Sequence, residues 1–490
     1  MATATQEPEP RSALEIFPNL RETGIQVPPE TAEFIHEPLS SPSGFRLLRL
    51  LSEEGDDIPR CELIHDDLAS ATVPPYVAVS YTWTDETQPD VSLPILVNGR
   101  CLRVSYNVWN FLQNYRCTKM ARLLWIDQIC INQTSEGAGE RTQQVQHMYE
   151  IYARAARDVL WIGEPDKDTE NAMDLFFALS NLEKARAGPA AATYPLSEDL
   201  LNPLFTQAHN LPPFPSQKWE SLMHFVSKPV FQRAWIIQEV AAAGMTYMFS
   251  GLLMLPFSTL AFGATFVANS RWDTRLHDTY SVPGKFKAIT ALKNCHIRHH
   301  LKQPQSLELL LASTRIFKST RPQDKIFALV NLHRGHSDTP TPSLLVPTYE
   351  KAAPQVFRDV TRYLINQGSL DVLSGVEDQS LREIQGLPSW VPDYSVHQAV
   401  TILCMPPRRD DITLYSAASA LPVRVAGGSD NPDVLTLSGF KLDTIASVSS
   451  ADLAKESMYT KLEACAGMIN LERPYRGIRA HRPSTPSGVH

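Results

Sequence analysis

The sequence has little that would point to a nucleic-acid-binding or a secreted protein. Its formal net charge is −8 with a pI near 6.0, and no run of Lys or Arg supplies the basic surface that phosphate backbones need. The 7 cysteines are scattered and form no CxxC pair, which favours reduced thiols over a disulfide framework. No basic segment followed by an apolar one opens the chain. We therefore expect a cytoplasmic protein that does not bind nucleic acid.

Familiar cofactor and metal motifs are also missing. The sequence contains no GxxxxGK[ST], GxSxG or GxGxxG pattern. The stretch NCHIRHHLK looks like a metal cluster, and Cys295 and His299 could share a helix face, but a structural metal site needs four ligands and no further pair lies near in the sequence. We expect a polar helix face there, and no metal or certain cofactor.

One long uncharged stretch, from Val240 to Ser270, needs to be distinguished from a membrane span. Ser250, Gly251 and Pro256 interrupt it, so we expect a buried strand, a turn and an apolar helix rather than a transmembrane helix.

The first half of the chain alternates apolar strands with amphipathic helices. Three runs, PYVAVSYTW, LLWID and DVLWIG, are as apolar as strands that are covered on both faces, and helical patterns separate them. This rhythm implies right-handed crossovers and an α/β fold with a mainly parallel sheet flanked by helices. Asn98 and Gly99 stand between two further strand-like runs and predict a type I′ hairpin.

Helical patterns dominate from residue 171 onward. We expect a disordered tail over 1–43, an α/β domain over 44–243 with its core at 76–243, and a helical region over 244–400. A small α/β segment over 401–472 and a disordered tail over 473–490 follow. The expected helices cover residues 169–183, 216–228, 232–243, 284–300, 305–316, 322–333 and 349–367.

Polar residues arrive together where one buried strand should end, in LLWIDQICINQ. Asp127, Asn132 and Gln133 follow the strand, and carboxyl ends of parallel strands open onto ligand-binding crevices. The competing interpretation is structural, because Asp and Asn side chains commonly hydrogen-bond the backbone of a turn. We expect Cys130, between two isoleucines, to be a buried thiol.

Two other segments carry candidate binding groups. Glu140 and Arg141 open a helix, where an acid complements the helix dipole and an arginine could clamp a phosphate or carboxylate. Glu239 lies in the apolar helix FQRAWIIQEV, so it faces solvent, pairs with Arg233, or serves acid-base chemistry with a raised pKa.

The ordered set of motifs resembles the fungal heterokaryon incompatibility (HET) domain family. The resemblance rests on YVAVSYTWTD, LLWIDQICINQ, ERTQQVQHMYEIYARAARDVLWIGE, FQRAWIIQEV, RPQDKIFALVNL and LPSWVPDYS. It implies a role in non-self recognition between fused fungal cells and in the cell death that follows, through a protein partner.

The same resemblance implies a distant relation to Toll/interleukin receptor (TIR) domains, several of which hydrolyse NAD. TIR enzymes carry their glutamate four residues after a Trp, and Trp235 and Glu239 repeat this interval. The resemblance makes Glu239 the catalytic candidate and NAD a possible substrate, with Asp127, Asn132, Gln133, Glu140 and Arg141 as candidate ligand-binding residues. The alternatives are a non-catalytic, self-associating signalling module and, as a weaker third, a metabolic accessory enzyme.

Overall fold

The computed structural model describes eight stretches of the chain. They are residues 31–52, 58–83, 91–116, 120–186, 193–303, 305–334, 340–397 and 431–437. The chain divides into two compact units, Met1–Thr436 and Leu437–His490. The expected small segment at 401–472 falls almost wholly outside the described residues, and the expected tail at 473–490 does so entirely. The boundary that we placed at residue 243 stays a prediction.

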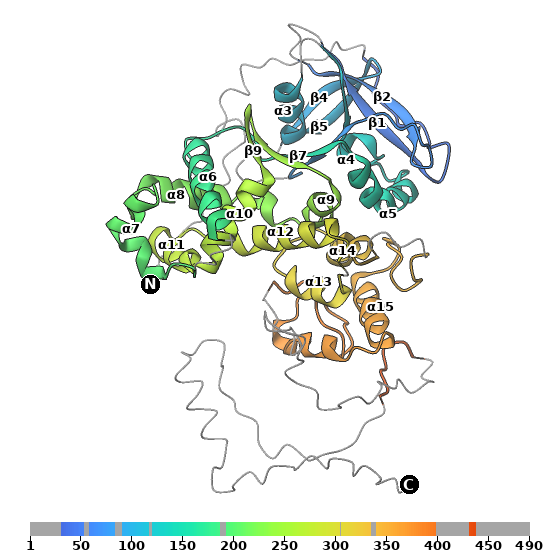
Figure 1. Cartoon of the computed structure of the whole chain (residues 1–490). Helices are drawn as coiled ribbons and strands as arrows, with labels where there is room; N and C mark the ends of the chain where they lie inside the picture. The colour runs from blue at the N-terminus through green and yellow to red at the C-terminus, as the bar shows by residue number, and fades with distance from the viewer. Residues whose placement is uncertain are drawn as a thin grey trace, which may run out of the picture. The chain divides into compact units, whose positions relative to one another are not determined.

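The described residues form one nine-stranded sheet with the order β5-β4-β2-β1-β6-β3-β7-β8-β9 (Figure 1). The strands are β1 (Gly44–Leu50), β2 (Arg60–Asp67), β3 (Val77–Ser80), β4 (Ser92–Val97), β5 (Arg100–Ser105), β6 (Arg122–Trp125), β7 (Arg157–Trp161), β8 (Thr246–Ser250) and β9 (Leu253–Pro256).

The sheet is mixed, so the expected parallel arrangement holds for part of it. The neighbours β6, β3, β7 and β8 run parallel, whereas β1 pairs antiparallel with both β2 and β6. The outer pairs β4/β5 and β8/β9 are also antiparallel, because two-residue turns join them. Asn98 and Gly99 have φ of 50° and 75°, which confirms the predicted type I′ hairpin.

The predicted helices are present, with shifts of a few residues at their ends, and the structure adds others, among them those at Pro203–Ala208 and Trp272–Tyr280. The described helices are α3 (Tyr106–Tyr115), α4 (Asp127–Cys130), α5 (Ala138–Arg154), α6 (Thr169–Arg186), α7 (Pro203–Ala208), α8 (Gln217–Val226), α9 (Ile236–Ala242), α10 (Phe257–Asn269), α11 (Trp272–Tyr280), α12 (Phe286–His300), α13 (Leu307–Ser313), α14 (Asp324–Arg334) and α15 (Ala353–Asn366). Short 3-10 helices lie at Ser197–Leu201, Pro229–Gln232, Asp371–Gly375 and Gln379–Leu381.

Helices cover both faces of the parallel strands. Trp125 of β6 pairs in register with Ala78 of β3 and packs edge-on against Tyr152 of α5, so α5 lies on that face. Trp161 of β7 points to the opposite face and packs against Phe111 of α3. Figure 1 shows α3 and α5 on the two sides of the sheet. The four aromatic side chains and Ala78 are at most 1% exposed, so they lie in the core.

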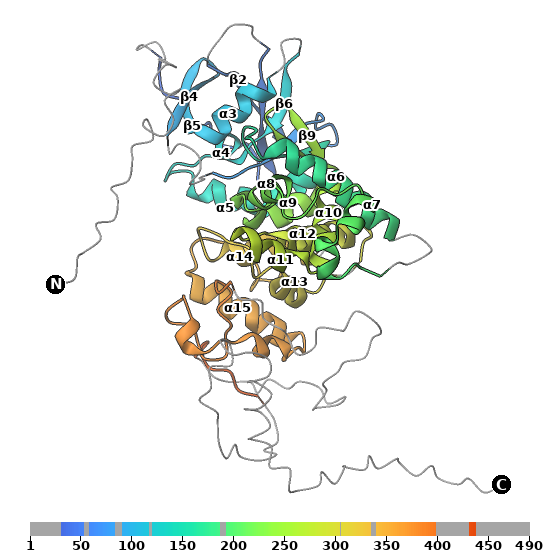
Figure 2. The same cartoon turned by 90° about the vertical axis from the view of Figure 1, so that its left-hand side faces the viewer.

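The uncharged stretch from Val240 to Ser270 folds as predicted. It forms the end of α9, the hairpin β8 and β9, and the buried helix α10. α10 packs against α6 and α12, and α12 packs against α9 (Figure 2). No described helix is long and apolar enough to cross a membrane.

The expected helix over 232–243 is broken at its start. A 3-10 turn at Pro229–Gln232 leads into an extended Arg233, and α9 begins only at Ile236. The break has a physical cause, since the Ala234 N–H donates to the Lys318 carbonyl at 2.7 Å and the Lys318 N–H donates to the Gln232 carbonyl. A bridge from the helical region therefore takes the backbone bonds that would extend the helix.

A buried arginine joins the sheet to α5. Arg46, in the middle of β1, is 0% exposed and makes a two-pronged ion pair with Glu140, with N–O distances of 2.7 and 2.9 Å. Arg46 also donates to the carbonyls of Glu37 and Cys130. The contact with Glu37 shows that part of the expected tail over 1–43 packs against this domain. Residue 33 likewise bridges to Cys101.

The first prediction concerns this buried ion pair. Glu140→Ala leaves the Arg46 charge buried without a partner, so we expect it to lower the free energy of unfolding by about 3 kcal/mol. Glu62→Ala is the matched control, because its 2.9 Å pair with Arg49 is exposed and should contribute less than about 1 kcal/mol. Urea denaturation of both variants measures the difference. Equal losses would show that the Arg46 pair does not hold α5 to the sheet.

Candidate functional site

Asp127 lies where β6 meets the single-turn helix α4, at the carboxyl ends of two neighbouring parallel strands. Its carboxylate accepts hydrogen bonds from the Tyr81 hydroxyl at 2.6 Å and from the Trp83 indole N–H at 2.9 Å. Tyr81 and Trp83 follow β3, so the two strand ends are tied together by side chains. Asp127 also accepts its neighbour's backbone N–H, as the structural interpretation of this residue requires.

Glu239 is enclosed on α9, beside the same strand ends. Its side chain is 2% exposed, and the nearest Arg233 nitrogen lies 3.7 Å from its Oε2. Burial raises the pKa of Glu239 to about 7, although Arg233 opposes this shift, and the Asp127 carboxylate raises the pKa further. Asp127 and Glu239, 112 positions apart in the sequence, therefore belong to one electrostatic cluster.

Arg233 connects the acids of this cluster with the backbone of β3. Its guanidinium donates a hydrogen bond to the Tyr81 carbonyl. The Arg233 side chain is 19% exposed. Burial lowers the pKa of Arg233, but Glu239, Asp127 and two nearby tyrosines raise it by more, so the pKa is raised. The sequence suggested Arg233 only as a pairing partner for Glu239, and the 3.7 Å contact agrees with that interpretation.

Asp158 is a second buried acid that the sequence analysis did not select. It is 0% exposed at the start of β7, and its Oδ1 accepts from the Ser80 hydroxyl at 2.9 Å. Burial raises the pKa of Asp158 well above its usual value, and the nearby Glu239 charge adds to the shift. Ser80 also hydrogen-bonds Glu239, so it lies between the two acids. The sequence feature that could have identified Asp158 is an acidic residue inside DVLW, a strand predicted to be buried on both faces.

Three predicted ligand-binding residues are engaged within the protein. The Asn132 side chain accepts from the N–H and hydroxyl of Thr134 at 3.1 and 2.8 Å, forming an Asx turn. The Gln133 amide donates to the Asp127 carbonyl at 2.9 Å. Glu140 is held by Arg46 and by the Asn132 N–H, and these bonds outweigh burial and lower its pKa. These contacts shape the loop after β6, and a ligand role for the three residues stays a prediction.

Arg141 lies one residue further along α5 and is held less completely. Its Nε is buried and has no hydrogen-bond partner. The side chain lies near Tyr349, which belongs to the helical region. Arg141 is therefore the candidate binding residue with the most hydrogen-bonding capacity left to offer.

The histidines of α12 have a structural role. His296 and His300 lie 2.9 Å from the Val240 and Ala243 carbonyls, where α9 ends. Such contacts satisfy backbone groups that a helix end leaves unpaired. No group of His, Cys, Asp and Glu in the described ranges could hold a metal ion. Burial raises the pKa of Cys130 and that of Cys295 to about 12 each, so both thiols stay protonated at neutral pH.

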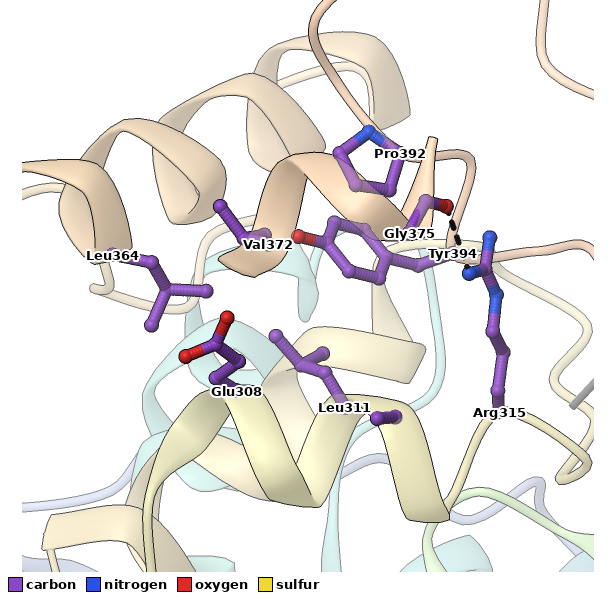
Figure 3. Close-up of a pocket in the computed structure, with 9 residues that line it drawn as sticks. Glu308, Leu311, Arg315, Leu364, Val372, Gly375, Pro392 and Tyr394 are labelled. Atoms are coloured by element: carbon purple, nitrogen blue, oxygen red, sulfur yellow. Dashed lines mark hydrogen bonds between the residues drawn. The ribbon is translucent and has the colours of Figure 1, made fainter. Parts of the chain in front are cut away.

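Two hollows lie away from the Asp127–Glu239 cluster. A cavity of about 190 Å³ borders Ala242, Gly244, His299, His300 and Lys302, beyond the end of α9. Figure 3 shows a second one, of about 20 Å³, between Glu308, Leu311, Leu364 and Tyr394. The second volume suits about one water molecule. Beside it, Arg315 donates to the Asp393 carbonyl within the LPSWVPDYS segment, and to the Gly375 and Val396 carbonyls outside that segment.

The second prediction follows from the pKa of Glu239. The folded pKa of about 7 exceeds the usual 4.5, so the folded state holds this proton more tightly than the unfolded state. The resulting stability is fully present below pH 4.5 and is lost as the pH rises through 7. Relative to Glu239→Gln, the wild-type chain should lose about 3 kcal/mol of unfolding free energy between pH 4.5 and 8. Urea midpoints at several pH values test this, and parallel curves would contradict it.

The third prediction isolates the coupling between the two acids. Asp127→Asn removes a negative charge that raises the pKa of Glu239, so the Glu239-dependent loss of stability should move to lower pH. One of the Tyr81 and Trp83 donors also loses its acceptor, which costs about 1–3 kcal/mol. Asp174→Asn, on the exposed face of α6, is the matched control and should change neither quantity. If the pH midpoint of the Glu239-dependent stability loss is unchanged in Asp127→Asn, the two acids are not electrostatically coupled.

Comparison with known proteins shows what this segment of the chain is similar to. Residues 76–239 match the model of the heterokaryon incompatibility protein (HET) family. The chain is 24% identical over 419 residues to heterokaryon incompatibility protein 6, OR allele, of Neurospora crassa, which covers 76% of this chain and 60% of that protein. It is 26% identical over 107 residues to the vegetative incompatibility protein HET-E-1 of Podospora anserina, or 22% of this chain and 8% of that protein.

The chain thus spans less than two thirds of the length of these relatives. No solved structure matches it at a significant level. The matched segment runs from Tyr76, before β3, to Glu239 on α9, and so contains both acids of the cluster. Residues 76–239 therefore match a HET domain, and the chain is similar to heterokaryon incompatibility protein 6 over 76% of its length.

Proposed function

We propose that the protein acts in fungal non-self recognition and the ensuing cell-death signalling, in the cytoplasm, through NAD hydrolysis by a TIR-like HET domain. The observation that carries this proposal is the convergence of Asp127, Arg233 and Glu239 on one cluster beside the sheet. The relatives are named incompatibility proteins, which supports the biological role. A protein partner supplies the recognition.

The order of the parallel strands supports the TIR-like part of the proposal. The neighbours β6, β3, β7 and β8 read 2-1-3-4 when they are numbered along the chain, which is the order of flavodoxin-like folds. In such sheets ligands bind at the carboxyl ends of the strands where the order reverses, here between β3 and β7. Ser80 and Tyr81, at the end of β3, touch Asp158 and Asp127.

The chemistry of the cluster suits cleavage of the nicotinamide–ribose bond. Breaking this bond develops positive charge on the ribose as nicotinamide leaves with the bonding electrons. The Glu239 carboxylate would stabilise that charge, and water would then add to give ADP-ribose and release a proton. With a pKa of about 7, Glu239 is partly ionised at neutral pH, and a cationic ligand would favour its charged form.

A second candidate function is a self-associating signalling module that breaks no bond. The enclosure of Glu239 favours it, because this carboxylate is 2% exposed and faces Arg233. In this version the sequence motifs build the fold and an assembly surface, and the homo-oligomer itself is the signal.

The fourth prediction separates the two functions. The full chain, concentrated or crosslinked, should release nicotinamide from NAD, and Glu239→Gln should lower the rate at least about 100-fold, because it removes the group that stabilises the developing charge. Glu150→Gln, on the exposed side of α5, is the matched control and should keep the wild-type rate. Circular dichroism confirms that each variant folds. No nicotinamide at any concentration, with assembly intact, would refute the enzymatic proposal in favour of the signalling module.

A further inference from the structure

Two arginines from distant segments lie near the same tyrosine. Arg321, just before α14, places its guanidinium carbon 4.6 Å from the ring centroid of Tyr349. Arg141, on α5, is near enough to act on the Tyr349 hydroxyl, as Arg321 also does. The two cations come from the HET domain and from the helical region that follows it.

Arg141 and Arg321 have N–H donors that could bind a further acceptor. In the described parts of the chain, no carboxylate forms an ion pair with Arg141 or Arg321, and the Arg141 Nε is buried without a partner. Arg321 is exposed. The nearby Asp324 is occupied, since it accepts the Tyr349 hydroxyl at 2.7 Å and the Trp235 indole N–H. Asp324 also interacts electrostatically with Arg321, so two arginines, Arg141 and Arg321, share this place with one carboxylate.

Trp235 links this place to the Asp127–Glu239 cluster. Its indole hydrogen-bonds Asp324, and its carbonyl accepts the Glu239 N–H at 3.1 Å. Arg233, which faces Glu239, also acts on Asp324. Trp235 therefore connects the two places, through its indole to Asp324 and through its backbone to Glu239.

We propose that Arg141, Arg321 and Tyr349 form an anion subsite that holds the diphosphate of a dinucleotide whose ribose lies at Glu239. The assignment of the dinucleotide rests on the function proposed above. Arginine forks bind phosphate oxygens in pairs, and the Tyr349 ring holds the Arg321 guanidinium in place by a cation–π contact. The HET domain at 76–239 alone would lack Arg321 and Tyr349, so the helical region completes the binding site.

The fifth prediction uses inorganic pyrophosphate as the probe, with the full chain and isothermal titration calorimetry. Arg141→Ala and Arg321→Ala should each weaken pyrophosphate binding at least about 10-fold, because each removes charge-assisted hydrogen bonds to the anion. Arg321→Lys should recover only part of the affinity, because a lysine keeps the charge but lacks the paired donors. Arg100→Ala, an exposed arginine on the outermost strand β5, is the matched control and should bind as the wild type does.

Glu239→Gln distinguishes this subsite from the proposed reaction. This variant should bind pyrophosphate like the wild type even though it cleaves no NAD. Pyrophosphate binding without NAD cleavage by the wild-type chain would overturn the reaction and keep the subsite. Failure of the wild-type chain to bind pyrophosphate at about 10 mM, or equal affinity in Arg321→Ala, would overturn the subsite, whatever the outcome with NAD.

Discussion

The enclosure of one carboxylate beside one guanidinium is the interaction on which the rest of this structure depends. Glu239 is almost fully removed from water, and Arg233 lies close enough to oppose the resulting pKa shift without cancelling it. A buried acid with only partial charge compensation is costly to keep in a folded protein, and perturbed acids of this kind gather at functional sites. Asp158 adds a second buried acid through Ser80. The end of β3 therefore carries two buried carboxylic acids with raised pKa values, Glu239 and Asp158.

The surrounding contacts hold the elements that carry this cluster. The Arg46–Glu140 pair fixes α5 to β1, and the His296 and His300 rings contact the last carbonyls of α9. The backbone bridge at Lys318 keeps Arg233 out of the helix, so that its side chain reaches β3. Elements that lie outside the residues matched by the family model therefore position the charged groups inside it. This division explains why the helical region belongs to the proposed site rather than to a separate module.

Local patterns in the sequence predicted the elements better than their arrangement. The Asn98–Gly99 turn, the buried strands and the apolar helix α10 follow from residue types within a few positions of one another. The order of the strands does not follow from them, because β1 lies between β2 and β6 through the pairing of Leu48 with Leu124, which are 76 positions apart in the sequence.

The candidate site shows the same limit. Asp127 and Glu239 stood out as polar residues in apolar surroundings, whereas the parts that Asp158 and Arg321 play depend on neighbours that only the fold supplies. The Lys318 bridge that breaks the expected helix at Arg233 is likewise a non-local bond, and the helical periodicity of FQRAWIIQEV gave no sign of it.

A crystal structure of the Glu239→Gln chain with NAD bound would test the central claim most directly, since that claim is spatial. The account predicts one NAD molecule with its nicotinamide-bearing ribose at residue 239, beside Asp127 and Arg233, and with its diphosphate between Arg141 and Arg321. Electron density for NAD on any other surface, with this cluster closed and unchanged, would contradict it.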